Sequence, residues 1–266
     1  MAQDQYDYAI IGNCTSAALV SPECSIDWLC FPFFDSPSLF ARILDEKKGG
    51  YFRILGVDTV SVTQSYLFNT PIVKTVFETK DGVFEVRDFM PRFVTFRGDV
   101  YCPSEIHRDI HVVRGRPKMM IELDPKPNYA SSGAKFTEHK EYIKIASQKG
   151  EYNSFYLYCN LDHKKVLSGE PIELAESTYF LLSYHEKIEP VNLDKVYLEY
   201  EKTKSYWMDW VFRTKLPPRY KEMLTRSAIT LKLLMYQKTG AVIAAPTTSL
   251  PRSSAATATG ITVFAG

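Results

Sequence analysis

The 266-residue chain lacks the features that mark several functional classes. Its 32 basic and 31 acidic side chains leave a net charge of +1 and form no basic stripe or polybasic tract. We therefore expect neither nucleic acid nor a membrane as a partner. No apolar run approaches the roughly 20 residues that span a bilayer. The start, "MAQDQYDYAIIGN", lacks the cationic region and the long apolar core that are typical of a signal peptide. These absences predict a soluble, cytoplasmic protein.

Cysteine is scarce and irregularly spaced. The five cysteines form no CxxC pair, and no phosphate-binding loop such as GxGxxG is present, so we expect no metal and no other cofactor. The nearest approach to a ligand pair is His107 and His111 in "IHRDIHVV". On an extended strand their rings would lie about 13 Å apart, too far to share one metal ion. Both are therefore predicted to be surface histidines of a strand.

Up to about residue 190 the pattern is that of β-structure. Short segments rich in β-branched and aromatic residues alternate with turn signals, as in "TVSVTQSYLF" (59–68) and "VFEVRDFM" (83–90). Asp81-Gly82, between two such segments, is a strong hairpin signal. Because no helical segments separate the strands, the sequence predicts a mainly β fold with an antiparallel sandwich rather than a parallel α/β sheet.

Charged residues within these strands have structural interpretations that we favour over catalytic ones. Glu85 and Asp88 are predicted to be solvated or to pair across a hairpin. Glu105 and Arg108 in "PSEIHR" are predicted to form an ion pair.

After residue 190 the spacing of apolar residues becomes helical. One helix is predicted over 192–214, with Asn192 or Asp194 as its cap and Pro217 as its stop. A second helix is predicted over 218–236. Its apolar stripe comprises Met223, Leu224, Ala228, Leu231, Leu234 and Met235.

Three long stretches resemble a known family. They are residues 11–54, which include "SIDWLCFPFFDSPSLFA", residues 67–93, and residues 226–251, which include "TGAVIAAPTTSLP". In this order they are similar to the amino-terminal half of the family 15 glycoside hydrolases, in the trehalase-like and glucoamylase-like branch. The resemblance runs from about Tyr6 to Pro251. The chain departs from the family pattern in "NCTSAAL" and at Phe33, where the family often has Arg.

The resemblance implies a large antiparallel super-β-sandwich, a linker helix and then an (α/α)₆ barrel. The barrel of the family holds two Glu carboxylates that hydrolyse an α-glucosidic bond with inversion. On this chain the sandwich is expected over 1–190, the linker helix over 191–217, and the first helix and loop of the barrel over 218–251. The remainder of the barrel is expected to be absent, so we assign no catalytic residue and expect this chain to be inactive alone.

Residues 252–266 differ in character from the chain before them, because they are mainly small and neutral. In the family, "APTTSLP" is followed by a motif resembling "RNWDYRxCWxRDA", whose side chains line the sugar site. Standard codons can be chosen for 252–266 so that one nucleotide restored at the Pro251 codon yields "EEFGGNRNWDYRFCW". We therefore predict that a frameshift, rather than a natural alternative C-terminus, produced this tail, and that residues 252–266 are disordered or held only by accidental contacts.

Six residues are candidates for contacts to substrate. They are Trp28, Phe31, Asp35, Thr247, Thr248 and Ser249. The two aromatic residues belong to "DWLCFPFF" and provide sugar-stacking faces, with packing in the core as the favoured alternative. The aspartate either contacts substrate or caps the turn at "FDSPS", and capping is favoured. The three hydroxyl residues of "APTTSLP" are expected to support the active site of a complete enzyme.

The implied substrate is an α-glucoside, bound only by a full-length enzyme. Two other functions remain open from the sequence. One is a stand-alone carbohydrate-binding module that uses the aromatic residues of "DWLCFPFF". The other is an assembly module, in which the apolar stripe of the helix at 218–236 mediates a homo-oligomer.

Overall fold

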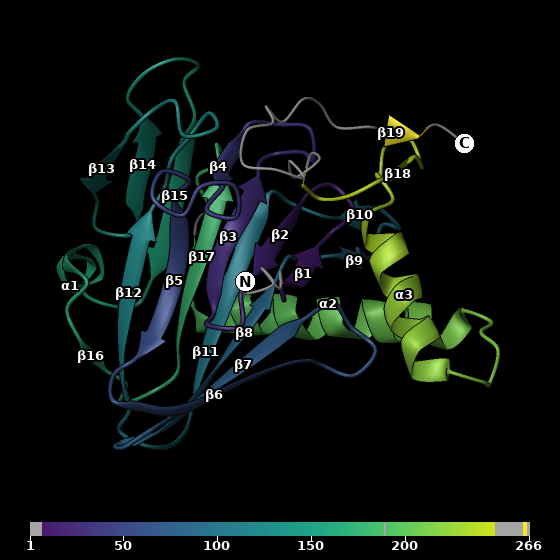
Figure 1. The fold of residues 1–266 in the computed structure, drawn as a ribbon, viewed down its shortest axis with the longest axis horizontal. Coiled ribbons are helices and arrows are strands. Elements are labelled where there is room, and N and C mark those ends of the chain that lie inside the picture. The colour runs from purple at the N-terminus through teal and green to yellow at the C-terminus, as the bar shows by residue number, and fades with distance from the viewer. Residues whose placement is uncertain (1–6, 189, 248–262, 265–266) are drawn as a thin grey trace, which may run out of the picture.

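The computed structural model describes residues 7–188, 190–247 and 263–264. Within these ranges the strands form a seven-stranded sheet, an eight-stranded sheet and two small two-stranded sheets, and all strand pairs are antiparallel. The prediction of a mainly β, antiparallel fold is confirmed (Figure 1). Among the described helices, none has the length and apolar character needed to cross a membrane.

The seven-stranded sheet begins with the first strands of the chain. In spatial order it contains β1 (Ala9–Gly12), β2 (Ala17–Val20), β3 (Ser25–Cys30), β5 (Tyr51–Gly56), β12 (Lys118–Asp124) and β16 (Ile172–Glu173), and β4 (Ser38–Phe40) pairs with β3. All six residues of β3 are buried, so this strand is covered on both faces.

The eight-stranded sheet forms the second layer. In spatial order it contains β13 (Ala134–Glu138), β14 (Ile143–Ser147), β15 (Ser154–Cys159), β17 (Thr178–Tyr184), β11 (Glu105–Gly115), β8 (Gly82–Phe89), β7 (Val73–Thr79) and β6 (Thr59–Tyr66). The register of β7 with β8 ends in the pair Thr79–Gly82, which places the turn at Lys80–Asp81. The predicted hairpin is present, but its turn lies one residue earlier than the Asp81-Gly82 pair, because Gly82 is the first residue of β8.

The main core lies between these two sheets. Phe52 of β5 and Phe180 of β17 meet there edge to face, with ring centroids 5.6 Å apart. Phe77 and Phe84, on neighbouring strands of the eight-stranded sheet, stack at 4.7 Å. Burial of rings and branched side chains from both layers gives the sandwich its main stabilisation, since a fully buried side chain of this kind contributes about 1.5–3 kcal/mol.

A long helix covers the outer face of the eight-stranded sheet. This helix, α2 (Leu193–Arg213), contacts β17 and β11 and runs across the strands in Figure 1. Its buried residues recur every three or four positions and are Val196, Glu199, Tyr200, Thr203, Trp207 and Val211. Asn192 caps the helix by accepting a hydrogen bond from the backbone N–H of Lys195, as predicted.

The second long helix, α3 (Lys221–Leu233), packs back on β1. Thr225, Ile229 and Leu233 form its buried side, whereas Met223 and Leu231 are 69% and 59% exposed. The predicted apolar stripe therefore differs from the buried side of the helix. Apolar residues lie on more than one side of α3, and some of them are exposed.

One helix and several short strands have no counterpart among the elements expected from the sequence. The helix α1 (His163–Ser168) lies between β15 and β16, with Asp162 as its cap and Gly169 in the left-handed region at its end. The short strands are β9 (Phe93–Val94), β10 (Val100–Tyr101), β18 (Val242–Ile243) and β19 (Val263–Phe264). β19 pairs with β18. The remainder of the tail predicted to be disordered lies outside the described residues.

Candidate functional site

Two of the recognisable stretches meet at one place although they are far apart in sequence. The indole N–H of Trp28, on β3, donates a hydrogen bond of 2.7 Å to the carbonyl oxygen of Pro246. Trp28 is 1% exposed, and Thr247, the next residue of the "APTTSLP" segment, is also buried. The structure therefore joins two of the candidate regions. Thr248 and Ser249 lie outside the described residues.

The aromatic turn that follows β3 is largely packed against the protein itself. Phe31 is 2% exposed and has its ring centroid 6.4 Å from that of Tyr184. Asp35 is exposed, and the hydroxyl of Ser36 makes the capping contact by accepting from the backbone N–H of Phe33 at 3.0 Å. Neither Trp28 nor Phe31 offers a ring face to solvent, and their roles in substrate binding stay predictions.

A buried arginine joins the third recognisable stretch to the other two. Arg92 is 2% exposed, and its guanidinium donates to the carbonyl oxygen of Asn13 at 2.8 Å, to the hydroxyl of Tyr206 at 3.0 Å and to the side chain of Gln237. Its backbone N–H donates to the hydroxyl of Thr203. We call this set, Asn13, Arg92, Thr203, Tyr206 and Gln237, the Arg92 junction. It connects the first sheet, α2 and the segment after α3.

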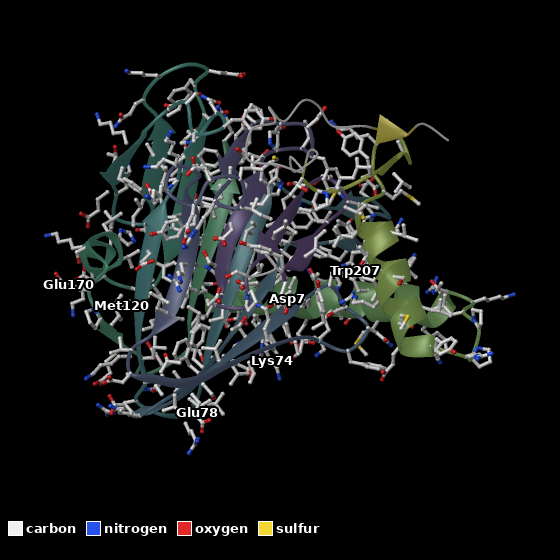
Figure 2. The ribbon with its side chains drawn as sticks, viewed as in Figure 1. Asp7, Lys74, Glu78, Met120, Glu170 and Trp207 are labelled. Atoms are coloured by element: carbon white, nitrogen blue, oxygen red, sulfur yellow. The ribbon has the colours of Figure 1, made fainter. Side chains whose placement is uncertain are left out.

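The loop after β1 is shaped to receive α3. A side chain at Gly12 would place its Cβ 2.7 Å from Leu233 Cδ2 and 2.8 Å from the carbonyl oxygen of Ser16, so glycine permits the close approach of the helix. Cys14, with a positive φ of 67°, donates its thiol to the carbonyl oxygen of Lys232 at 3.2 Å. Burial raises the pKa of this thiol. Trp207 of α2, labelled beside α3 in Figure 2, belongs to the apolar cluster that also contains Leu233.

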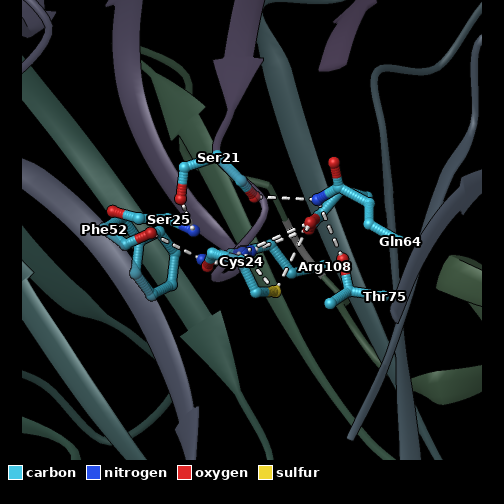
Figure 3. Close-up of polar contacts among 8 residues, drawn as sticks. Ser21, Cys24, Ser25, Phe52, Gln64, Thr75 and Arg108 are labelled. Atoms are coloured by element: carbon cyan, nitrogen blue, oxygen red, sulfur yellow. Dashed lines mark hydrogen bonds and ion pairs between the residues drawn. The ribbon is translucent and has the colours of Figure 1, made fainter. Parts of the chain in front are cut away.

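A fully buried ion pair joins neighbouring strands of the eight-stranded sheet, and its arginine, Arg108, is labelled in Figure 3. Arg108 donates to Asp88 at 2.7 Å and to the carbonyl oxygens of Phe52 and Cys24, both at 2.7 Å. Both charged side chains are 0% exposed. Burial raises the pKa of the Cys24 thiol to about 12. The set is a structural centre, because each nitrogen of the guanidinium donates to an acceptor within the core.

This ion pair corrects two predictions. Arg108 pairs with Asp88 rather than with Glu105, since residues three apart on a strand face opposite sides of the sheet. Asp88 is buried rather than solvated. Glu85, on the other face, pairs with Arg87 of its own strand rather than across a hairpin.

A second buried polar group lies on the outer face of the same sheet, under α2. His107 Nε2 is 3.0 Å from Glu105 Oε2 and 3.2 Å from Glu199 Oε2, and all three residues are buried. Lys195 and Tyr101 donate to the other carboxylate oxygen of Glu199. Within the described chain, Glu199 Oε2 and His107 Nδ1 have no hydrogen-bond partner. We call Glu105, His107 and Glu199 the buried triad.

The triad corrects the prediction that His107 is a surface histidine. His107 is 0% exposed, because α2 covers this face, whereas His111 remains partly exposed and contacts Asp109 at 2.6 Å. The sequence contained a signal for the triad in the alternation of Glu105 and His107, which share one face of a strand. The third member lies 92 positions after His107 (199 − 107), on a helix whose packing the sequence did not specify. Burial of both carboxylates leaves them little surface for a sugar.

Comparison with known proteins agrees with the arrangement of these stretches. A family model described as "Trehalase-like, N-terminal" matches residues 4–156. A trehalase from Thermoplasma acidophilum is 35% identical over 250 residues, which cover 88% of this chain and 41% of the relative. A trehalase from Mycobacterium tuberculosis is 29% identical over 273 residues, covering 93% and 40%. Trehalase 2 from Sulfolobus acidocaldarius is 28% identical over 252 residues, covering 92% and 41%.

The chain thus spans about two fifths of the length of these curated relatives. The family match begins before β1 and ends within β15. It includes the aromatic turn, Arg92 and the two triad residues of β11, Glu105 and His107. It covers more than half of the 266 residues. The chain therefore belongs to the trehalase-like N-terminal family.

Proposed function

We propose that this chain is the amino-terminal β domain of a glycoside hydrolase of family 15. In this proposal the domain acts together with a helical (α/α)₆ barrel that holds two catalytic carboxylates. The complete enzyme hydrolyses an α-glucoside, trehalose or a starch-derived oligosaccharide, with inversion. The similarity to the Thermoplasma trehalase over 88% of the chain is the observation that supports this proposal most directly.

The geometry also suits a domain that positions a catalytic barrel rather than one that carries out hydrolysis itself. The Arg92 junction and the contact of Trp28 with Pro246 hold the segment before Thr247 against the sandwich. The best candidates for a carboxylate pair, Glu105 and Glu199, are 3% and 5% exposed. We therefore propose that the 266-residue chain does not hydrolyse α-glucosides alone, and that its role is to fix the orientation of the catalytic barrel.

This proposal is tested by following glucose release from trehalose, maltose and isomaltose with the purified chain. The expected result is no turnover above a blank. Sequencing the coding DNA across codon 251 is the companion experiment. A restored frame that encodes a helical barrel supports the proposal, and the longer product is then expected to release the inverted anomer of glucose. Turnover by the short chain that survives repurification would contradict it.

An assembly role is a second candidate, supported by an apolar surface between α2 and α3. A groove of 770 Å³ lies there, and its apolar lining includes Phe68 and Phe212, which are 74% and 90% exposed. Met223 and Leu231 add exposed apolar surface on α3. We propose that this surface mediates self-association of the chain. Light scattering at several concentrations tests it, with Phe212→Ser expected to lower the mass; a wild-type mass that stays monomeric at every concentration excludes it.

A further inference from the structure

We propose that the buried triad of Glu105, His107 and Glu199 is a binding site for a divalent transition-metal ion of the zinc class. The site would lie between the eight-stranded sheet and α2. It is separate from the substrate contacts considered above, and it does not depend on the proposed hydrolase function.

The backbone places the three donors around one point. Glu105 and His107 are two positions apart on β11, so both side chains project from the same face of the sheet. Glu199 belongs to the face of α2 that packs on this strand. The ring of Phe89 lies against the imidazole, with centroids 4.8 Å apart, and restricts its movement. A strand and a helix therefore supply a fixed set of one nitrogen and two oxygen donors.

The separations suit a tetrahedral ion. His107 Nε2 is 3.0 Å from one carboxylate oxygen and 3.2 Å from the other, and the three donor atoms lie within 4.8 Å of one another. With metal–ligand bonds of about 2.0–2.1 Å, tetrahedral ligands are separated by about 3.3 Å. Small side-chain shifts are enough to admit the ion, and the fourth position remains for a water molecule.

One donor atom has no polar partner in the described chain other than the imidazole, which lies 3.2 Å from it. Glu199 Oε2 is buried without a hydrogen-bond partner, and the side chain of Glu199 is 7% exposed. Its second oxygen accepts from Lys195 and from Tyr101, at 3.4 Å for the tyrosine. These two contacts hold the carboxylate so that Oε2 faces the imidazole. A metal-bound carboxylate commonly has such outer partners, which orient it and restrain it.

The electrostatics of the triad favour an added cation. Two buried carboxylates face one ammonium group, that of Lys195, which leaves an excess of negative charge. The metal ion requires neutral imidazole with its proton on Nδ1, because Nε2 must provide a lone pair. An imidazole ligand favours zinc-class ions over Mg²⁺, which prefers oxygen ligands.

The direct test measures zinc in the full chain. The protein is stripped with a chelator, exposed to Zn²⁺ and dialysed, and its metal content is determined by mass spectrometry. We expect about one zinc ion per chain with the wild type and at least a tenfold loss of affinity in His107→Gln and in Glu199→Gln. His111→Gln is the matched control, because His111 lies on the same strand and pairs with Asp109 outside the triad. The control is expected to retain the ion.

A second measurement does not depend on whether the variants fold. Co²⁺ replaces zinc in the wild type, and its visible absorption reports the ligands and the geometry. Tetrahedral bands without a thiolate charge-transfer band are expected from one nitrogen and two oxygen donors. A strong thiolate band would place the ion on a cysteine and overturn the proposal. Failure to retain zinc, or equal retention in the wild type and a folded His107→Gln variant, would also overturn it.

Discussion

Trp28 and Pro246 are joined by a 2.7 Å hydrogen bond although they lie 218 positions apart in the chain. The donor lies on β3, near the centre of the first sheet, and the acceptor follows α3 and β18. The segment that follows β18 is thus held against the first sheet of the sandwich by a buried and directional contact.

The contribution of this hydrogen bond to the free energy of unfolding can be measured with the same Trp→Phe substitution at two buried positions. Trp28→Phe removes the indole donor and leaves the carbonyl oxygen of Pro246 without this partner. Trp207→Phe is the matched control, because Trp207 is fully buried and its indole nitrogen has no partner within the described residues. We expect Trp28→Phe to lower the free energy of unfolding by about 1 kcal/mol more than the control. Urea unfolding of both variants measures the difference, and equal losses would show that the hydrogen bond contributes little.

The buried ion pair should be far more sensitive than an exposed one. Asp88→Asn leaves the Arg108 guanidinium buried without its counter-charge, and we expect a loss of about 3–5 kcal/mol in the free energy of unfolding. Glu78→Gln disrupts the exposed pair with Arg114 and is expected to cost less than about 1 kcal/mol. Chemical denaturation compares the two. Similar small losses in both variants would mean that the core accommodates the unpaired arginine.

Alkaline pH should destabilise the fold through its buried thiols. Burial raises the pKa of both Cys24 and Cys30 from 9.0 to about 12. Between these values the folded chain keeps protons that the unfolded chain has lost, so stability is complete below pH 9 and falls as the pH rises toward 12. Urea midpoints measured from pH 8 to pH 11 test this. The urea midpoint should fall less steeply with pH in Cys30→Ala than in the wild type. An unchanged pH dependence would mean that other groups cause the loss of stability.

The cap of α2 gives a further prediction. Asn192→Ala removes the side-chain acceptor for the backbone N–H of Lys195 and should lower the free energy of unfolding by about 1 kcal/mol. Asn192→Ser should restore most of it, because serine is also a good cap. Thermal unfolding followed by circular dichroism compares the three proteins. If serine behaves as alanine does, the asparagine acts through another contact.

Local patterns were sufficient for much of the fold. Asp81-Gly82 indicates the β7–β8 hairpin to within one residue, because the preference for a turn depends on neighbouring residues alone. The cap at Asn192 is local for the same reason. Helix α1 was missed because its six residues are too few for an apolar period to emerge.

Long-range packing decided the features that the sequence did not reveal. Glu105 and Arg108 are neighbours in sequence, but the strand directs them to opposite faces, and only the position of Asp88 on β8 identifies the arginine's partner. The position of His107 in the interior depends on α2, which follows more than 80 residues later (193 − 107). The interpretation of Trp28 as core is consistent with its burial, whereas its contact with Pro246 required the path of the chain after α3.

The close contact of α3 with Gly12, together with the ties from Arg92, has a mechanical consequence. Rotation of that helix by even a fraction of a turn would drive Leu233 into the backbone of β1 and separate Gln237 from its guanidinium partner. The link that α3 and the segment after it form with the sandwich is therefore rigid rather than hinged. A domain that followed this link would therefore keep a fixed orientation relative to the sandwich. A force that rotated that domain would act on the loop at Asn13, through its contact with Arg92.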